Sequence, residues 1–328
     1  MFYNENCISG AKNHIEDDSI DLIISDPPYG IEGDLLDKHY NRDESNVIDG
    51  YVEVAAAEYP QFSKDWIKEA ERVLRPGGSI YIISGYTNLR HVLNALAETK
   101  LQEVNHIIWR YNFGVYTRKK YISSHYHILY FVKTGGEVTF NRNTFFSDDE
   151  KTPAGLSANA ADREDVWNIN REYKPGEVKN KNQLPETLLR KMILYSSNPD
   201  NLVCDFFLGS FSTAKVAIGL GRNACGFELN KAAFEYQSEQ VAKIKKGELL
   251  STLRNVPENK NINTGKKLTD AERETVISMY NKYIRSGYTK KAGIEKISEA
   301  LGRGRFSIAN IVGDAEGAVQ VEPPNSLF

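Results

Sequence analysis

Asp26, Pro27, Pro28 and Tyr29 follow directly on the apolar run of residues 20–25. They place a carboxylate, a rigid backbone carbonyl and an aromatic ring at one point of the chain. The two prolines fix φ and cannot continue a hydrogen-bonded ladder, so a strand formed by the apolar run must end there. A carboxylate, which only accepts hydrogen bonds, suits the exocyclic amine of a planar base when a flat ring lies beside it. The simpler alternative is a Pro-Pro turn with an Asp cap after an ordinary strand.

A second group of candidate residues lies far downstream, in residues 201–228. An apolar strand leads into a tight Gly-Ser turn that opens a helix, and a second strand then ends in Glu228. A carboxylate at the tip of the second strand of a β-α-β unit can accept both hydroxyls of a ribose. Because the loop holds a single glycine, the pattern predicts a nucleoside cofactor without phosphates, with plain β-α-β structure as the alternative. The candidate cofactor residues here are Asp205, Phe207, Gly209, Ser210, Thr213 and Glu228.

Apolar runs that indicate strands alternate with amphipathic helical patterns over the first 240 residues. The strand candidates are residues 21–24, 79–84, 104–109, 127–132, 202–204 and 224–227. Strands that alternate with helices predict a mostly parallel sheet with helices on both faces. Ligands bind at the carboxyl ends of strands in such sheets, which is where both candidate groups lie.

Composition places the chain among globular proteins with one large α/β domain and a small accessory domain. Hydrophobic residues make up 41% and charged residues 26% of the 328 residues, and the net charge is −3. The sequence has no run of 18 or more apolar residues and no basic-then-apolar leader, so we expect a cytoplasmic protein without a membrane segment. The net charge does not by itself indicate nucleic-acid binding, which depends on local basic patches.

The cysteines and histidines do not predict a metal site. Cys7, Cys204 and Cys225 are far apart and lie in apolar contexts, which favours buried free thiols. His125 and His127 fall on one face of a predicted strand, but a metal needs more ligands than these two. We therefore expect these histidines to make structural or substrate contacts.

Further segments depart from the strand–helix alternation. Residues 135–182 are polar and long enough to be an inserted recognition region, with a disordered insertion as the alternative. Residues 246–267 have the composition of a linker. Residues 268–313 predict three short helices with a basic bias, which resemble a helix-turn-helix module, although a small oligomerisation or docking domain has a similar pattern. Residues 314–328 are expected to be a loose tail.

The chain has the Asp26–Tyr29 motif before the Gly-Ser turn of residues 201–228. With the two motifs in this order, it resembles the amino-group DNA methyltransferases that use S-adenosylmethionine, in the permuted beta arrangement. The resemblance covers about residues 1–240. Five further segments match the motifs of that family in order: Leu74–Gly78, Trp109–Asn112, His125–Leu129, Asp165–Trp167 and Asn182–Glu186. The resemblance implies a doubly wound, mostly parallel, seven-stranded Rossmann-like methyltransferase sheet, circularly permuted. Residues 1–245 would be its catalytic domain, with a target-recognition insert at 135–182 and a C-terminal helical domain.

The resemblance also implies the activity, which is methylation of adenine N6 by an enzyme of the DPPY type. Asp26 and the Pro27 carbonyl would hold the two amine N–H groups, and Tyr29 would stack on a base flipped out of the duplex. Pro28 completes the catalytic motif. The implied cofactor is S-adenosylmethionine, and further residues expected to bind it are Asn6, Cys7, Asp26 and Pro185.

Double-stranded DNA is the expected partner, and the resemblance also allows a homodimer and a cognate restriction endonuclease. Basic residues outside the two candidate groups are the expected DNA contacts. They are Arg118, Lys119, Lys120, Arg142, Arg171, Arg303 and Arg305.

The sequence departs from the family pattern in the cofactor loop, which usually reads DPFxGSG. Phe206 stands where the pattern has proline and Phe211 where it has the second glycine, and a phenylalanine lacks the backbone freedom of glycine. Leu184 replaces the usual lysine, and Asn6 stands where many relatives have aspartate. These differences bear on the expected pose and affinity of the cofactor, whereas the catalytic motif itself matches the family pattern.

Three alternative functions remain open on sequence grounds. Cytosine-N4 methyltransferases use the same motif order, but they more often have serine in place of Asp26. Methylation of RNA or of a protein glutamine usually goes with asparagine at that position, and the permuted order argues against it. The altered cofactor loop also allows a non-catalytic DNA-binding protein with a degenerate methyltransferase fold.

Overall fold

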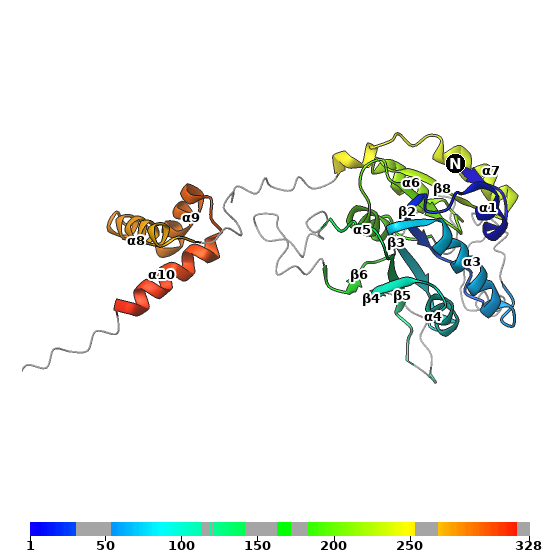
Figure 1. Ribbon diagram of the computed structural model, residues 1–328, viewed down its shortest axis with the longest axis horizontal. Helices are drawn as coiled ribbons and strands as arrows, with labels where there is room; N and C mark the ends of the chain where they lie inside the picture. Colours follow the sequence, from blue (N-terminus) through cyan, green and yellow to red (C-terminus); the bar gives the residue numbers. More distant parts are fainter. Residues whose placement is uncertain are drawn as a thin grey trace, which may run out of the picture. The chain divides into compact units, whose positions relative to one another are not determined.

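The computed structural model describes residues 1–30, 54–112, 118–119, 121–141, 163–171, 183–252 and 268–319 (Figure 1). The chain divides into two compact units, Met1–Val256 and Pro257–Phe328. The first unit contains the sheet and both candidate groups, and the second contains three helices. Among the described residues, no helix has the length and apolar character needed to cross a membrane.

The first unit is built on one eight-stranded sheet. In spatial order its strands are β1 (Phe2–Tyr3), β8 (Asn223–Phe227), β7 (Leu202–Asp205), β2 (Ile20–Ser25), β3 (Leu74–Ser84), β5 (His125–Lys133), β4 (Leu101–Arg110) and β6 (Val166–Asn168). Only the pairs that involve β5 are antiparallel, so the predicted mostly parallel sheet is confirmed. In the described part of the chain, this sheet has eight strands rather than the expected seven. Its edge strands β1 and β6 have two and three residues, too few to show an alternating pattern in the sequence.

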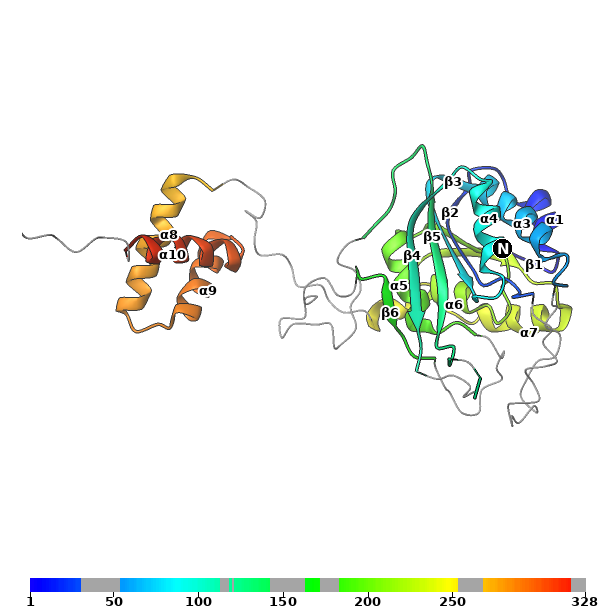
Figure 2. The same ribbon diagram turned by 90° about the horizontal axis from the view of Figure 1, so that it is seen from below.

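Helices cover both faces of this sheet, as Figure 2 shows. On one face, α1 (Cys7–His14), α3 (Tyr59–Val73) and α4 (Leu89–Ala97) pack into a core that includes Trp66 and Ile23. On the other face, α5 (Glu186–Ser196), α6 (Ser212–Gly219) and α7 (Lys231–Val241) pack into a second core. The three cysteines are buried and free, as predicted.

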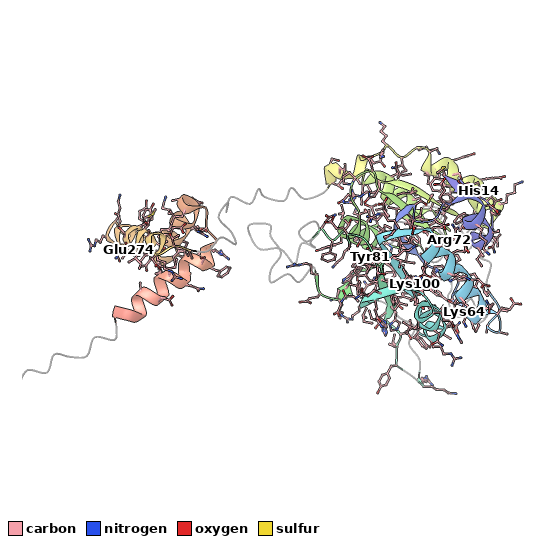
Figure 3. All side chains as sticks on the ribbon, viewed as in Figure 1. His14, Lys64, Arg72, Tyr81, Lys100 and Glu274 are labelled. Atoms are coloured by element: carbon pink, nitrogen blue, oxygen red, sulfur yellow. The ribbon has the colours of Figure 1, made fainter. Side chains whose placement is uncertain are left out.

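Helix α3 shows why these elements form where they do. Its buried residues Trp66, Ile67, Ala70 and Val73 recur at helical spacing and face the sheet. Arg72, labelled in Figure 3, donates hydrogen bonds to the carbonyl oxygens of two α1-side residues, Ala11 (2.8 Å) and Ile15 (3.1 Å). These bonds tie the C-terminal end of α1 to α3, so α1 is held against the sheet.

The connections of the sheet reverse direction between β2 and β7. The chain leaves β2 and crosses through α3 to β3, whereas it leaves β7 and crosses through α6 to β8, on the opposite side. The two strands are parallel neighbours, with Leu22 beside Val203 and Ile23 beside Cys204. The point where strand order reverses is the usual ligand-binding position of open α/β sheets. Both candidate groups of the sequence follow these two strands.

The second unit contains α8 (Asp270–Arg285), α9 (Lys290–Leu301) and α10 (Arg305–Val319). Buried residues from all three helices form its core: Val276, Tyr280, Ile297, Ile308, Ile311 and Val312. Thr269 and Glu272 form a capping box at the start of α8. Three helices therefore lie where the sequence placed them.

The structure moves two of the predicted boundaries. Residues 248–252, predicted as part of the linker, form the short helix η3 (Glu248–Thr252), whose Leu249 packs against Gly219 of α6. Helix α10 continues to Val319, beyond the predicted end of the helical domain at residue 313. Of the predicted recognition insert at 135–182, the structure describes residues 135–141 and 163–171. The second of these ranges contains β6.

Candidate active site

The Asp26–Gly30 turn is fixed by contacts from the next strand connection. Gly30 has φ +64°, and a Cβ there would overlap the Tyr59 ring and the Asn88 side chain, so the turn requires glycine. The Asn88 amide donates hydrogen bonds to the carbonyl oxygens of Tyr29 (2.6 Å) and Gly30 (3.1 Å). Sequence reasoning missed Asn88, although a polar residue just after β3 was a signal for this edge of the sheet.

The Asp26 carboxylate is held by the tyrosine of its own motif. The Tyr29 hydroxyl donates a hydrogen bond to Asp26 Oδ1 at 2.6 Å. Burial raises the pKa of Asp26 to about 7, and the hydrogen bond from Tyr29 opposes this rise. The charge of Asp205 raises the pKa further, and that of Arg171 lowers it. Asp26 therefore changes its protonation state near neutral pH.

The loop after β7 converges with this turn, as the sequence predicted. The Phe206 N–H donates to the Ser25 hydroxyl oxygen at 3.1 Å, which joins the ends of β7 and β2 directly. Asp205 accepts from the Phe207 N–H at 3.0 Å. Burial raises the pKa of Asp205 to about 6, against a hydrogen bond from Thr213, and the charge of Glu228 raises it further. Three acids from distant parts of the chain thus share one electrostatic environment.

Glu228 holds the Gly-Ser turn through both of its carboxylate oxygens. Oε2 accepts from the Gly209 N–H at 2.8 Å, and Oε1 accepts from the Asn230 N–H at 2.7 Å. Gly209 has φ +50°, a conformation that favours glycine. Each carboxylate oxygen can accept a further hydrogen bond, so the group retains capacity for hydroxyl donors. Burial raises the pKa of Glu228 despite these bonds.

Phe211 occupies the left-handed region, with φ 57° and ψ 23°, at the start of α6. Its side chain is fully buried, and its ring lies 5.2 Å from that of Phe2 and 6.0 Å from that of Phe234, centroid to centroid. The conformation that glycine adopts freely is therefore imposed on a phenylalanine by aromatic packing. Phe206, the other departure from the family pattern, is buried against Trp66 at 6.0 Å.

The N-terminus of α1 lies on the Asp205 side of the site. Asn6 caps α1, with its side-chain oxygen accepting from the Ile8 N–H at 2.9 Å. Burial raises the pKa of the Cys7 thiol to about 12, and the Asp205 charge contributes to that rise. Ser210 is buried in the turn before α6, and Pro185 is buried directly before α5.

Aromatic side chains gather beside Tyr29 at the ends of β4 and β5. The Tyr29 ring stacks on that of Tyr126 at 5.6 Å, and Trp109 and Tyr111 lie 5.5 and 5.4 Å from Tyr126. The Arg171 guanidinium lies 5.4 Å from the Tyr126 ring and donates to the Tyr126 hydroxyl at 3.0 Å. Arg171, predicted as a DNA contact, is thus next to the catalytic motif. Sequence reasoning did not select Tyr126, although it lies in a segment that matched the family.

The other basic residues predicted to contact DNA fall into three groups. Arg118 and Lys119 are exposed, and Arg305 is exposed at the start of α10. Lys120 and Arg142 lie outside the described residues. Arg303 is buried, 5% exposed, and its Nη2 donates to both carboxylate oxygens of Glu272 at 2.9 and 3.0 Å. The prediction that Arg303 contacts DNA was wrong, because this guanidinium is held inside the three-helix unit.

Comparison with known proteins identifies the first unit. A family model described as DNA methylase, covering amino groups of the N6 and N4 type, matches residues 20–240. The type II methyltransferase M.HpaI of Haemophilus parainfluenzae is 32% identical over 243 residues, which are 72% of this chain and 72% of that protein. The DNA adenine methyltransferase YhdJ of Escherichia coli K12 is 33% identical over 259 residues, 70% of this chain and 82% of that protein.

A solved structure shares the fold. The crystal structure of TTHA0409 from Thermus thermophilus, complexed with S-adenosyl-L-methionine, superimposes with a TM-score of 0.53. The match covers 75% of this chain and 94% of that one, at 18% identity. The arrangement of strands and helices is therefore shared with that protein.

Proposed function

Because the chain belongs to the N6/N4 DNA methylase family, we propose that it transfers a methyl group from S-adenosylmethionine to the N6 amine of adenine in double-stranded DNA. The protein is a DNA methyltransferase, and its methyl donor is S-adenosylmethionine. The observation that carries the choice of site is the convergence of Asp26 with Asp205 and Glu228 where the strand order reverses. The name of the Escherichia coli relative, which specifies adenine, supports the choice of base.

The residues after β7 and β8 fit the donor. S-adenosylmethionine supplies a methyl group on a positively charged sulfonium, together with an adenosine. The Glu228 carboxylate, already fixed by the Gly209 and Asn230 N–H groups, would accept the ribose hydroxyls. The buried carboxylates of Asp26 and Asp205 offer negative charge that is complementary to the sulfonium. A bound cation would stabilise the charged form of both acids and so lower their pKa values. Asn6, Cys7, Ser210, Thr213, Phe207 and Pro185 remain proposed contacts.

The Asp26–Tyr29 motif orients the amine of the target base. That nitrogen is a poor nucleophile because its lone pair is delocalised into the ring. The Asp26 carboxylate and the Pro27 carbonyl oxygen each accept one amine N–H, which turns the lone pair towards the methyl donor. As the nitrogen–methyl bond forms, the methyl–sulfur bond would break and S-adenosylhomocysteine would leave with the electron pair. Asp26 would stabilise the positive charge on the nitrogen, which then loses a proton to water, so catalysis consists mainly of alignment and charge stabilisation. Pro28 keeps the turn rigid.

The aromatic side chains beside Tyr29 would receive the base. Adenine N6 is out of reach inside a duplex, so the base must leave the stack. The Tyr29 and Tyr126 rings already stack on each other, and Arg171 lies over Tyr126. Planar groups that stack together in this way offer faces on which an extruded purine can stack in turn.

DNA backbone contacts in the first unit would come from exposed cations, of which Arg118 and Lys119 are described. Lys120 and Arg142 stay predictions on the same grounds. A homodimer, a cognate restriction endonuclease and a cytoplasmic location also stay predictions. Cytosine N4, the alternative target, presents the same kind of amine, and the identity of the methylated base decides between the two.

Long-read sequencing of DNA from cells that express the chain tests this function. We expect N6-methyladenine at one short sequence motif, and its absence from cells that express Asp26→Ala. N4-methylcytosine at the motif would assign the alternative target. DNA without any modification from cells that contain the folded protein would contradict the proposal.

A further inference from the structure

We propose that α10 is a base-reading helix, whose residues Arg305, Phe306 and Asn310 contact base edges in the major groove of duplex DNA. The ligand is named on the basis of the proposed function, since a DNA methyltransferase acts on DNA. The site itself is separate, because it belongs to the Pro257–Phe328 unit, which lies outside the matched family residues 20–240.

The connection between α9 and α10 has the length and the glycine content of the turn in a helix-turn-helix. Helix α9 ends at Leu301 and is capped by Gly302, which adopts the left-handed conformation with φ 57° and ψ 35°; α10 begins three residues after this cap, at Arg305. Within the turn, Arg303 is fixed by its paired hydrogen bonds to Glu272 of α8. A tight turn of three or four residues that contains glycine, between two packed helices, is the arrangement that presents a second helix to the major groove.

The buried side of α10 determines which residues face outwards. Ile308, Ile311 and Val312 are 0%, 4% and 1% exposed and pack in the three-helix core. Phe306 and Asn310, one turn apart, lie on the other side of the helix, and Arg305 is its first residue; all three are exposed. Phe306 is 74% exposed, the second highest value among the large hydrophobic side chains of the described residues. The first turns of α10 thus present a cation, an aromatic ring and an amide together.

The charge of this face suits DNA. The Arg305 guanidinium lies 5.0 Å from the Phe306 ring, and within the described part of the chain no carboxylate pairs with it. The first acidic residue of α10 is Asp314, nine positions after its start. A positively charged helix start without an internal counter-ion is complementary to the phosphate-lined groove.

The three side chains can also discriminate between bases. Arginine bonds in bidentate fashion to guanine, asparagine does so to adenine, and phenylalanine contacts the thymine methyl group. Arg305 and Asn310 are separated by about 7.5 Å along the helix axis, at about 1.5 Å per residue. This distance is about two base-pair steps of B-DNA, so the two side chains can reach different base pairs of one short element.

Sequence selection from a pool of duplexes with a randomised centre tests the proposal on the full-length chain. We expect the wild-type chain to enrich a short element. Phe306→Ala and Asn310→Ala should relax the preference at neighbouring positions of that element, and each should weaken binding to it roughly tenfold or more. Arg305→Ala should weaken binding. If Arg305 reads a base, the variant should also lose the preference at one position of the element; if Arg305 also contacts a phosphate, the slope of log K against log salt should fall by about one.

Lys282→Ala is the matched control, because Lys282 is an exposed cation of the same unit that lies about 15 Å along α8 from the Glu272 end. It should retain the wild-type element and affinity. The three α10 substitutions are on the surface, so their unfolding midpoints should equal that of the wild type. Selection of the same element at the same affinity by all α10 variants, or no enriched element for the wild type, would overturn the proposal.

Asp26→Ala, selected in parallel, separates this inference from the proposed function. It should enrich the same element as the wild type, because binding at α10 does not require methyl transfer. An enriched element that depends on α10, in a chain that methylates no DNA, would leave the inference standing while the proposed function fails.

Discussion

The Tyr29 hydroxyl donates a hydrogen bond of 2.6 Å to Asp26 Oδ1, so the aromatic residue and the acid of the Asp26–Tyr29 motif contact each other directly. The bond fixes the orientation of the carboxylate and occupies one of its acceptor positions. The second oxygen, or the same oxygen through its other lone pair, remains for the amine. The bond also opposes the effect of burial on the pKa of Asp26.

Removal of this hydroxyl should change the pH dependence of the reaction. The charged form of Asp26 would accept the amine, so kcat/KM for S-adenosylmethionine should fall as the pH drops through about 7, the pKa of this group in the free enzyme. Tyr29→Phe loses a hydrogen bond that lowers this pKa, so the midpoint of the pH profile should move upwards. Tyr236→Phe, an exposed tyrosine on α7, is the control. A midpoint that stays in place or moves downwards in Tyr29→Phe would contradict this role.

Asp26 should also destabilise the folded protein at alkaline pH. Its pKa rises from an unfolded value of 3.8 to about 7, so the folded state binds more protons than the unfolded state between these values. Stability is therefore lost as the pH increases through this window, which is the opposite of the usual carboxylate case. Asp26→Asn should stabilise the protein more at about pH 8 than at about pH 5.5, by roughly 1–2 kcal/mol in urea unfolding. An equal effect at both values would show that the pKa of Asp26 is not raised.

Phe211 should be needed for stability despite its strained backbone. Phe211→Gly relieves a left-handed conformation that costs about 1–3 kcal/mol, but it removes a buried ring whose loss costs about 3–5 kcal/mol. We expect a net loss of stability in thermal unfolding. Phe211→Leu keeps most of the volume and the strain, and it should lose less stability than the glycine variant. A glycine variant more stable than wild type would mean that strain outweighs packing.

Glu228 should control cofactor affinity by holding the Gly-Ser turn. Each carboxylate oxygen of Glu228 accepts a hydrogen bond from a backbone N–H group. In Glu228→Gln, the side-chain NH2 group replaces one of these oxygens and cannot accept that bond. Loss of a charge-assisted bond of about 1.5–3 kcal/mol corresponds to roughly ten- to hundredfold weaker binding of S-adenosylmethionine by calorimetry. Glu235→Gln on the exposed side of α7 should bind normally. Equal affinities for the two variants would remove Glu228 from the site.

The approach of Asp26 to Asp205, and of Asp205 to Glu228, could be predicted because it depends on local patterns. Two apolar runs that end in polar residues indicate two buried strands, and the carboxyl ends of parallel strands meet at one edge of the sheet. The contacts that refine the site could not be predicted in this way. Asn88 bonds to a turn 58 residues away, and Arg171 reaches Tyr126 across 45 residues. Neither interaction leaves a periodic signal in the sequence.

Arg303 illustrates a second limit of the sequence. It lies two residues from Arg305 in a basic turn, and composition alone gives both the same expected role. The folded unit separates them, because the turn directs Arg303 inwards to Glu272 and leaves Arg305 on the surface. The capping box at Thr269 and Glu272, visible in the sequence as a helix start, is the element that provides the partner of Arg303.

Mass spectrometry of nucleosides tests the central claim most directly, with duplex DNA incubated with S-adenosylmethionine and either the wild-type chain or Asp26→Ala. We predict N6-methyl-2′-deoxyadenosine with the wild type only, while Asp26→Ala still binds S-adenosylmethionine in calorimetry. N4-methyl-2′-deoxycytidine from the wild type, or N6-methyl-2′-deoxyadenosine in equal amounts from both proteins, would contradict it.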